Sequence, residues 1–363
     1  MIIMDQPSTP IQMEGPVCPV PLRHNEQIVL GHGSGGRMTN DLIRQVFQPA
    51  LSSPALLEGN DFARLSLPEG AALQGRLITS TDCHIVSPLF FPGGDIGRLA
   101  VCGTVNDIAV SGARPLYLTA GFILEEGLPI DTLHRVVQSM QAAAGEAGVQ
   151  IVAGDTKVVE RGKADGLFIT TTGIGWLPDQ IHIGGERAQK GDVVLVSGSV
   201  GDHGIAVLAE RGELGFTTEI KSDTAPLNHL IDAMLQAAPH VHVLRDPTRG
   251  GLATTLKEIA EQSRVDIQLE EKAIPIAPGV RAACEMLGFD PLYIANEGKM
   301  IVILPEDEAD AALQALRAHP YGVSAMRIGA VLPGQSGRVS IRTPLGATRV
   351  LDMLAGEMLP RIC

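Results

Sequence analysis

The chain has 363 residues, of which 45% are hydrophobic and 19% are charged, and this indicates a folded protein long enough for two domains. Its formal net charge of −13 argues against a nucleic-acid-binding protein, which would carry a basic stripe. Its five cysteines include no CxxC pair, and an odd number without close pairing favours reduced thiols and a cytoplasmic location.

Residues 1–26 contain five prolines and predict a flexible N-terminal extension. This segment has neither the basic start nor the long apolar stretch of a signal peptide. No run in the chain approaches the roughly 18 apolar residues of a membrane span, so we expect no membrane association.

Apolar runs and helical periodicity alternate irregularly along the rest of the chain. In the first half they predict strands at 76–82, 116–124, 149–155 and 166–176, and helices at 95–110 and 131–148. Asp95 is a good N-cap for the first helix, and Gly148 is a plausible stop for the second. The polar, glycine-containing segment 182–192 predicts a domain boundary. We therefore expect two α+β domains, 27–182 and 183–350, followed by a mobile tail, 351–363.

A glycine-rich stretch at 31–36 matches GxGxxG between a predicted strand and a predicted helix. A dinucleotide fold would also need an acid ending a second strand about 20 positions later, and none is present. We interpret Gly33, Gly35 and Gly36 as a cover whose N–H groups bind phosphate. The alternative is a glycine turn without a ligand.

Acidic residues recur at the ends of apolar runs, in settings rich in glycine and threonine: Asp82, Asp107, Asp155 and Asp246. Any one of them could be only a cap or turn residue. Converging carboxylates repel one another and are stable mainly with a divalent cation between them, and oxygen ligands suit Mg²⁺ bridging nucleotide phosphates. Residues beside these acids are candidate nucleotide contacts, namely Asn106, Thr156, Arg249 and Gly250.

Six segments together resemble one family: HGSGGRMTNDLI, the long run from STDCHIV to FILEEG, GDTKVV, DPTRGGL, ANEGK and the terminal PRIC. They are similar to the HypE hydrogenase maturation proteins, which belong to the aminoimidazole ribonucleotide synthetase superfamily of ATP-using enzymes. The resemblance covers residues 27–363.

This resemblance implies an ATP-dependent dehydration on the terminal residue, Cys363. A partner carbamoyltransferase would load a carbamoyl group, which becomes a thiocyanate, and an iron-carrying maturation scaffold would accept the cyanide for a [NiFe]-hydrogenase. It implies Mg²⁺–nucleotide roles for Asp82, Asp107 and Asp246, whereas Asp155 matches a position of variable residue type. The superfamily also implies a homodimer.

Two residues compete for the role of base in such a reaction. Forming a nitrile requires removal of protons from nitrogen. Lys157 could contact phosphate or act as the base, and Glu297 is the rival. Their structural alternatives are a surface salt bridge for Lys157 and a cap or turn for Glu297.

Two other functions stay open at the level of sequence. One is a small-molecule kinase of the same superfamily, of the thiamine monophosphate kinase or selenophosphate synthetase type. The other is a non-enzymatic maturation scaffold. A kinase with a diffusible acceptor has no use for Cys363 at the tip of an extended tail, which favours the dehydratase.

Overall fold

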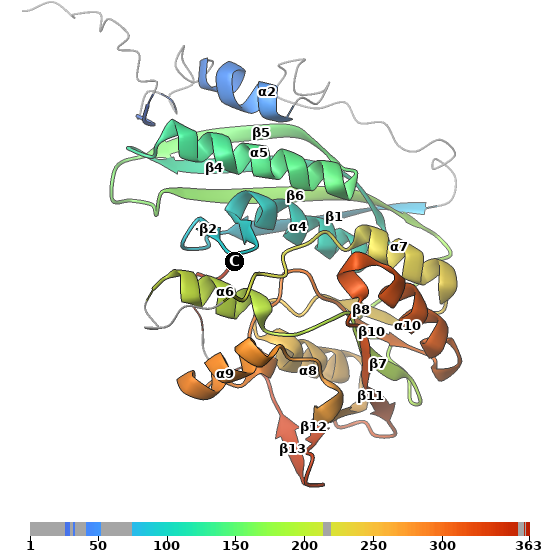
Figure 1. The fold of residues 1–363 in the computed structure, drawn as a ribbon. Coiled ribbons are helices and arrows are strands. Elements are labelled where there is room, and N and C mark those ends of the chain that lie inside the picture. The colour runs from blue at the N-terminus through green and yellow to red at the C-terminus, as the bar shows by residue number, and fades with distance from the viewer. Residues whose placement is uncertain are drawn as a thin grey trace, which may run out of the picture.

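The computed structural model describes residues 26–29, 32, 41–51, 75–212, 219–354, 359 and 361–363. Within these ranges the chain builds two main sheets, one in each half of the sequence, each packed with helices (Figure 1). This architecture confirms the α+β prediction. Except for Glu26, the predicted N-terminal extension lies outside the described residues.

The first domain is a four-stranded sheet in the order β1-β6-β4-β5. The strands are β1 (Gly75–His84), β4 (Arg114–Glu125), β5 (Gln150–Val159) and β6 (Leu167–Pro178). Helices α4 (Ile96–Ala109) and α5 (Ile130–Ala147) pack side by side on one face (Figure 1). Shorter elements are η2 (Ile43–Phe47), α2 (Gln48–Leu51), β2 (Phe90–Phe91) and β3 (Gly94–Asp95).

Both helices begin or end where the sequence predicts. Asp95 Oδ1 accepts hydrogen bonds from the backbone N–H of Gly97 (2.8 Å) and Arg98 (3.2 Å), which satisfies the free donors at the start of α4. Gly148 ends α5 with a φ of 70°, in the left-handed region that glycine adopts readily.

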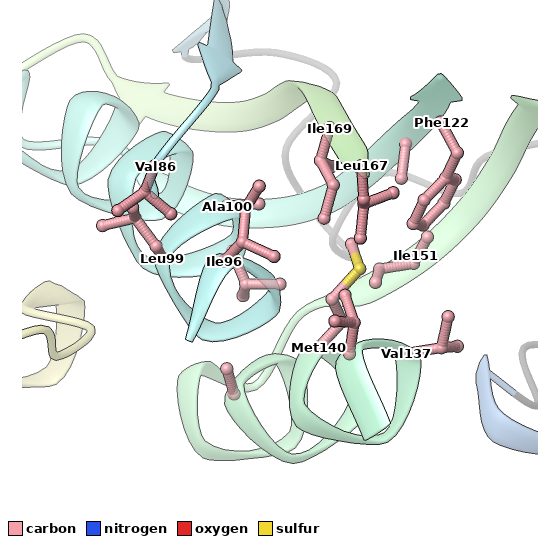
Figure 2. Packing of buried hydrophobic residues seen from close by; sticks show 14 of the residues in the cluster. Val86, Ile96, Leu99, Ala100, Phe122, Val137, Met140, Ile151, Leu167 and Ile169 are labelled. Atoms are coloured by element: carbon pink, nitrogen blue, oxygen red, sulfur yellow. The ribbon is translucent and has the colours of Figure 1, made fainter. Parts of the chain in front are cut away.

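An apolar core fills the space between these helices and the sheet. Figure 2 shows side chains of α4 and α5 facing those of the strands: Ile96, Leu99, Ala100, Val137 and Met140 against Phe122, Ile151, Leu167 and Ile169. Leu99, Met140 and Leu167 are fully buried. Burying a side chain of this size contributes about 2 kcal/mol, so this layer holds α4 and α5 against the sheet.

The second domain is a seven-stranded sheet in the order β13-β12-β9-β11-β7-β10-β8. The strands are β7 (Val193–Val196), β8 (Val243–Arg245), β9 (Asp266–Glu270), β10 (Ile301–Leu304), β11 (Met326–Leu332), β12 (Val339–Arg342) and β13 (Thr348–Leu351). The α-helices are α6 (Asp202–Glu210), α7 (Asn228–Ala237), α8 (Gly251–Ser263), α9 (Pro278–Leu287) and α10 (Ala309–Ala318). The 3₁₀ turns are η4 (Glu271–Ala273), η5 (Pro291–Tyr293), η6 (Glu306–Glu308) and η7 (Pro320–Gly322).

Helices cover both faces of the centre of this sheet. Val194 and Val196 of β7 belong to the core cluster that contains Leu256 of α8. Val193 and Leu195 belong to the opposite cluster, which is formed with α7 and α10. Every residue of β7 is therefore buried, and this explains why its sequence is an unbroken apolar run.

The two sheets are separated by a short connection. β6 ends at Pro178 and β7 begins at Val193, so the predicted boundary near residue 182 falls between them. No helix in the described ranges combines the length and apolar character needed to cross a membrane.

Candidate active site

Three of the predicted acids lie close together where the two domains meet. Asp82 is on β1, Asp107 is in the last turn of α4, and Asp246 directly follows β8. Burial, and then the charge of Asp107 and Asp82, raises the pKa of Asp246 to about 7. Burial and the charge of Asp82 likewise raise the pKa of Asp107, although Ser80 Oγ donates a 2.7 Å hydrogen bond to its Oδ2. These carboxylates therefore share one site.

A pocket of about 540 Å³ opens beside them. Its lining includes Asp107 from the first domain and Asp246 and Arg249 from the second. Helix α8 begins at Gly251, and Gly250 before it has a φ of 79°, which favours glycine. Acids, an arginine and the N-terminus of a helix thus meet at one pocket, as a metal–nucleotide site requires.

The chemistry of these donors fits Mg²⁺. The raised pKa values of Asp107 and Asp246 mean that too little positive charge and solvent surround their carboxylates, and a divalent cation would supply the missing positive charge. Among the described residues no group of three acidic, histidine or cysteine side chains is arranged to hold a metal ion by itself. Mg²⁺ commonly takes the rest of its ligands from phosphate oxygens and water, so a nucleotide would complete the set.

Replacing Asp246 with Asn should stabilise the protein without nucleotide at alkaline pH. An unfolded aspartate has a pKa of about 3.9. The folded state, with a pKa of about 7, binds the proton more tightly, so the free energy of unfolding falls as pH rises from about 4 to 7. In EDTA at pH 8 we expect Asp246→Asn to raise the free energy of unfolding by on the order of 2 kcal/mol, and at pH 4 to raise it little. Thermal unfolding measures both values. The exposed control, Asp179→Asn, should gain nothing, and an equal gain for Asp246→Asn at both pH values would contradict this.

Glu297 lies in the loop before β10 with only 5% of its surface exposed. Its backbone N–H donates to Asp223 Oδ1 (3.1 Å), and its Oε1 has no hydrogen-bond partner among the described residues. Its pKa lies well above the usual range, first because burial disfavours the charged form. Nearby carboxylates add to this effect: Asp223, Asp246, Asp82 and Asp107. Glu297 therefore belongs to the same acidic site, and a cation there would favour its ionised form.

The structure does not bring Asp155, Thr156 and Lys157 to this site within one chain. All three are on β5, three strands away from β1, which is about 14 Å at the usual spacing. Across the sheet, Asp155 is paired with Gly121, Gly121 with Thr170, and Thr170 with Cys83. Paired residues point to the same face, so Asp155 lies on the face of Cys83, which is opposite to that of Asp82. The exposed Lys157 Nζ binds the two carboxylate oxygens of Asp155 at 2.9 and 2.8 Å.

Of the other predicted nucleotide contacts, the structure describes Asn106 but not the three glycines of the glycine-rich stretch. Asn106 is buried, and both ends of its amide bind backbone of the second domain, including Leu227 N (2.8 Å) and Ala225 O (3.0 Å). Its side chain thus ties the domains together in this conformation. Gly33, Gly35 and Gly36 lie outside the described residues.

The end of the tail lies against its own chain. Ile362 is 3% exposed and joins the core of the first domain, and Cys363 packs partly against the same cluster. The backbone N–H of Ile85 donates to Cys363 O at 3.1 Å. Since Ile85 directly follows β1, this contact brings the last residue to the strand end that carries Asp82 and His84. Figure 1 shows the C-terminus between β2 and α6.

Several residues near the site have no sequence signal of their own. His84 is 1% exposed, its Nδ1 has no hydrogen-bond partner among the described residues, and its Nε2 lies 3.7 Å from Asp82 Oδ2. Asp223 is buried, with Lys299 Nζ 3.3 Å from its Oδ2. His84 is two positions after Asp82 on β1, a strand spacing that places both on one face, whereas only the tertiary fold brings Asp223 to the acids.

Two family models match the chain in succession. The N-terminal domain model of AIR synthase related proteins matches residues 60–177, and the C-terminal domain model matches residues 189–342. The chain therefore belongs to the AIR synthase related proteins.

Within that class the chain belongs to the HypE carbamoyl dehydratases. Carbamoyl dehydratase HypE of Azotobacter vinelandii is 55% identical over 339 residues, which cover 93% of this chain and 98% of the relative. A crystal structure of hydrogenase maturation protein HypE in complex with ATP superposes with a TM-score of 0.87 at 52% identity, covering 92% of this chain and 99% of that one. A HypE–HypF complex matches at 47% identity with a TM-score of 0.75, covering 86% of this chain and 99% of that one.

Proposed function

We propose that this chain is an ATP-dependent carbamoyl dehydratase that acts on its own Cys363. It converts an S-carbamoyl group into a thiocyanate, which supplies the cyanide ligand of a [NiFe]-hydrogenase iron centre. The observation that carries this proposal is the contact of the terminal residue with Ile85, which directly follows β1 and is three positions after Asp82. The name of the Azotobacter vinelandii relative and the ATP complex of HypE support it.

The reaction removes oxygen from S–C(=O)–NH₂, and hydroxide is a poor leaving group. Transfer of the γ-phosphoryl group of ATP to the carbamoyl oxygen, with loss of one N–H proton, replaces hydroxide by phosphate. Loss of the second N–H proton then expels phosphate and leaves S–C≡N, ADP and inorganic phosphate. The protein must hold the phosphates and accept protons from nitrogen.

Asp82, Asp107 and Asp246 would hold Mg²⁺, which neutralises the charge that develops on the phosphates during transfer. Glu297 is the base that the geometry favours, because it is buried in the acidic site of the same chain. Lys157, paired with Asp155 on the opposite face of the sheet, would contact substrate only from a second copy.

Asp107→Asn should weaken binding of Mg²⁺–ATP by about tenfold or more, while ATP binding in EDTA stays weak in both proteins. The amide cannot supply the charge that the cation needs. Isothermal titration with and without Mg²⁺ measures the difference. Asp179→Asn, on the surface, serves as the matched control. Unchanged Mg²⁺–ATP affinity in Asp107→Asn would remove it from the metal ligands.

A second copy of the chain would cover the open face of the first sheet. This face, opposite α4 and α5, exposes 59% of Leu77 and 42% of Ile123. Thr79 lies on the same face and also lines the acidic pocket, so a homodimer through this face would reach the pocket. Asp155 and Lys157, which lie on this face, would then act in trans, whereas Thr156 pairs with the buried Phe122 and lies on the helix-covered face.

Ile123→Asp should convert the homodimer into a monomer, because a charge on this face cannot be buried without a partner. Sedimentation equilibrium at micromolar concentration measures the mass. Leu345→Asp is the control, since Leu345 is 97% exposed in the turn between β12 and β13. A wild-type protein that is monomeric at all concentrations would contradict the homodimer.

The function also requires partners. A carbamoyltransferase must load Cys363, and the solved HypE–HypF complex supports such an association for the family. An iron-carrying maturation scaffold must accept the cyanide. Reduced thiols and a soluble ATP supply make the cytoplasm the expected location.

Mass spectrometry of the C-terminal peptide tests the function. After incubation with the partner, carbamoyl phosphate and ATP, the peptide should carry a carbamoyl adduct, which loses one water only when hydrolysable ATP is present. Turnover of thiamine monophosphate or selenide with an unmodified peptide would favour the kinase alternative. Absence of nucleotide binding would favour the scaffold.

A further inference from the structure

The tail pairs with the segment that follows β1. The backbone N–H of Ile85 donates to Cys363 O (3.1 Å), and that of Ser87 donates to Arg361 O (3.2 Å). In both bonds the segment after β1 donates and the tail accepts, so main-chain groups hold the tail in place. Arg361 also forms an ion pair with Asp165 in the loop between β5 and β6.

A buried histidine binds the residue between those two contacts. His203, in the first turn of α6, is fully buried, and its Nε2 lies 2.8 Å from Ile362 O. Since a carbonyl only accepts, Nε2 carries the hydrogen, and Nδ1 accepts from Ser222 Oγ at 2.8 Å. Ser222 Oγ in turn lies 2.7 Å from Thr224 Oγ1. The imidazole is therefore fixed in one orientation with its donor toward the tail.

An arginine at the other end of α6 joins the tail to its docking segment. Arg211 Nε donates to Ser87 O (2.8 Å), and its Nη2 donates to Arg361 O (2.7 Å). One guanidinium thus bridges two backbones that are 274 positions apart in the chain (361 − 87). Such charge-assisted bonds are stronger than neutral ones.

We propose that His203 and Arg211 are positioning residues that form a receptor for the tail and so deliver Cys363 to the acidic site. Neither belongs to the acids or the pocket lining described above, and both bind tail carbonyls in the docked state. The inference rests on the proposed function. It adds that these two side chains, at the two ends of α6, hold the tail in the docked position.

Alkylation of Cys363 measures docking without any assumption about catalysis. With N-ethylmaleimide and peptide mass spectrometry, free glutathione in the same reaction is the reference thiol. Arg211→Ala and His203→Ala should each raise the ratio of Cys363 to glutathione alkylation by about tenfold, the effect of losing one or two hydrogen bonds. His203→Gln, whose amide can still donate, should stay near wild type. Arg327→Ala, which removes a surface ion pair with Glu306 on the same domain, is the matched control.

Activity then separates positioning from general damage. In Arg211→Ala the carbamoyl group should be loaded at an equal or higher rate, while single-turnover dehydration slows by about tenfold and ATP affinity is unchanged. A misfolded variant would instead lose both steps. Unchanged alkylation ratios in both Arg211→Ala and His203→Ala would contradict the proposal that these residues hold the tail, even if the protein is a dehydratase. Altered ratios with no dehydration in the wild type would overturn the proposed function and leave the docking intact.

Discussion

Cys363→Ser should abolish formation of the modified tail while leaving ATP binding and thermal stability unchanged. A serine hydroxyl at neutral pH is a far weaker nucleophile than a cysteine thiol, so the partner has no group to load. The backbone contacts of the tail, from Ile85 to Cys363 O and from Ser87 to Arg361 O, do not involve the sulfur, so docking should persist.

The measurement is the mass of the C-terminal peptide after incubation with partner, carbamoyl phosphate and ATP. Cys83→Ser is the matched control, because Cys83 is exposed on the other face of β1 and should not carry substrate. Modification of the C-terminal peptide in Cys363→Ser, or modification that follows Cys83 instead, would contradict the assignment of the carrier.

Glu297→Gln should slow dehydration by about 10²- to 10⁴-fold, the range for loss of a general base. The same change should raise thermal stability at pH 8. The raised pKa of Glu297 in the folded protein means that burial opposes its ionisation, and the neutral amide removes this cost. A variant that is more stable and less active is the signature of a functional acid held in an unfavourable site.

Single-turnover kinetics with the carbamoylated protein and thermal unfolding measure the two effects. Lys157→Met tests the rival base in parallel. Full activity of Glu297→Gln together with loss of activity in Lys157→Met would transfer the role to Lys157 and require a second copy at the site. Glu271→Gln, in η4, is the control and should change neither measurement.

Local sequence signals account for much of the fold. The N-cap at Asp95, the stop at Gly148 and the apolar run of β7 depend on neighbours in the chain, and the structure agrees with each. Strand β13 has no such signal. Thr348–Leu351 is exposed at three of its four positions, so only its pairing with β12 makes it a strand.

The sequence predicted which residues belong to the candidate site better than it predicted how they are arranged in space. Asp82, Asp107 and Asp246 lie near the ends of strands or a helix beside small residues, and the structure brings them together, while their role as metal ligands stays a prediction. Asp155 has the same local pattern, yet it faces the other side of the sheet. That side is decided by the pairing of β4 with β5, which shifts register between Leu118 and Thr119, and no residue pattern encodes this shift.

The docking of the tail depends on contacts between residues far apart in the chain. Pro360 and the position of Cys363 predict an extended arm, but its length allows many destinations. His203 lies 159 positions from Ile362, and only the packing of α6 against β2 of the first domain brings the imidazole to the tail. Sequence therefore predicts the carrier, whereas the receptor follows from the three-dimensional structure.

Oxygen tracing tests the central claim most directly, namely that ATP activates a carbamoyl group held by the terminal sulfur. The partner loads the chain with a carbamoyl group labelled with ¹⁸O on its carbonyl, and one turnover is started with Mg²⁺ and unlabelled ATP. We predict that the label appears in inorganic phosphate at about one atom per thiocyanate formed, with ADP in equal amount. Label recovered in water, or thiocyanate formed without ATP, would contradict the account.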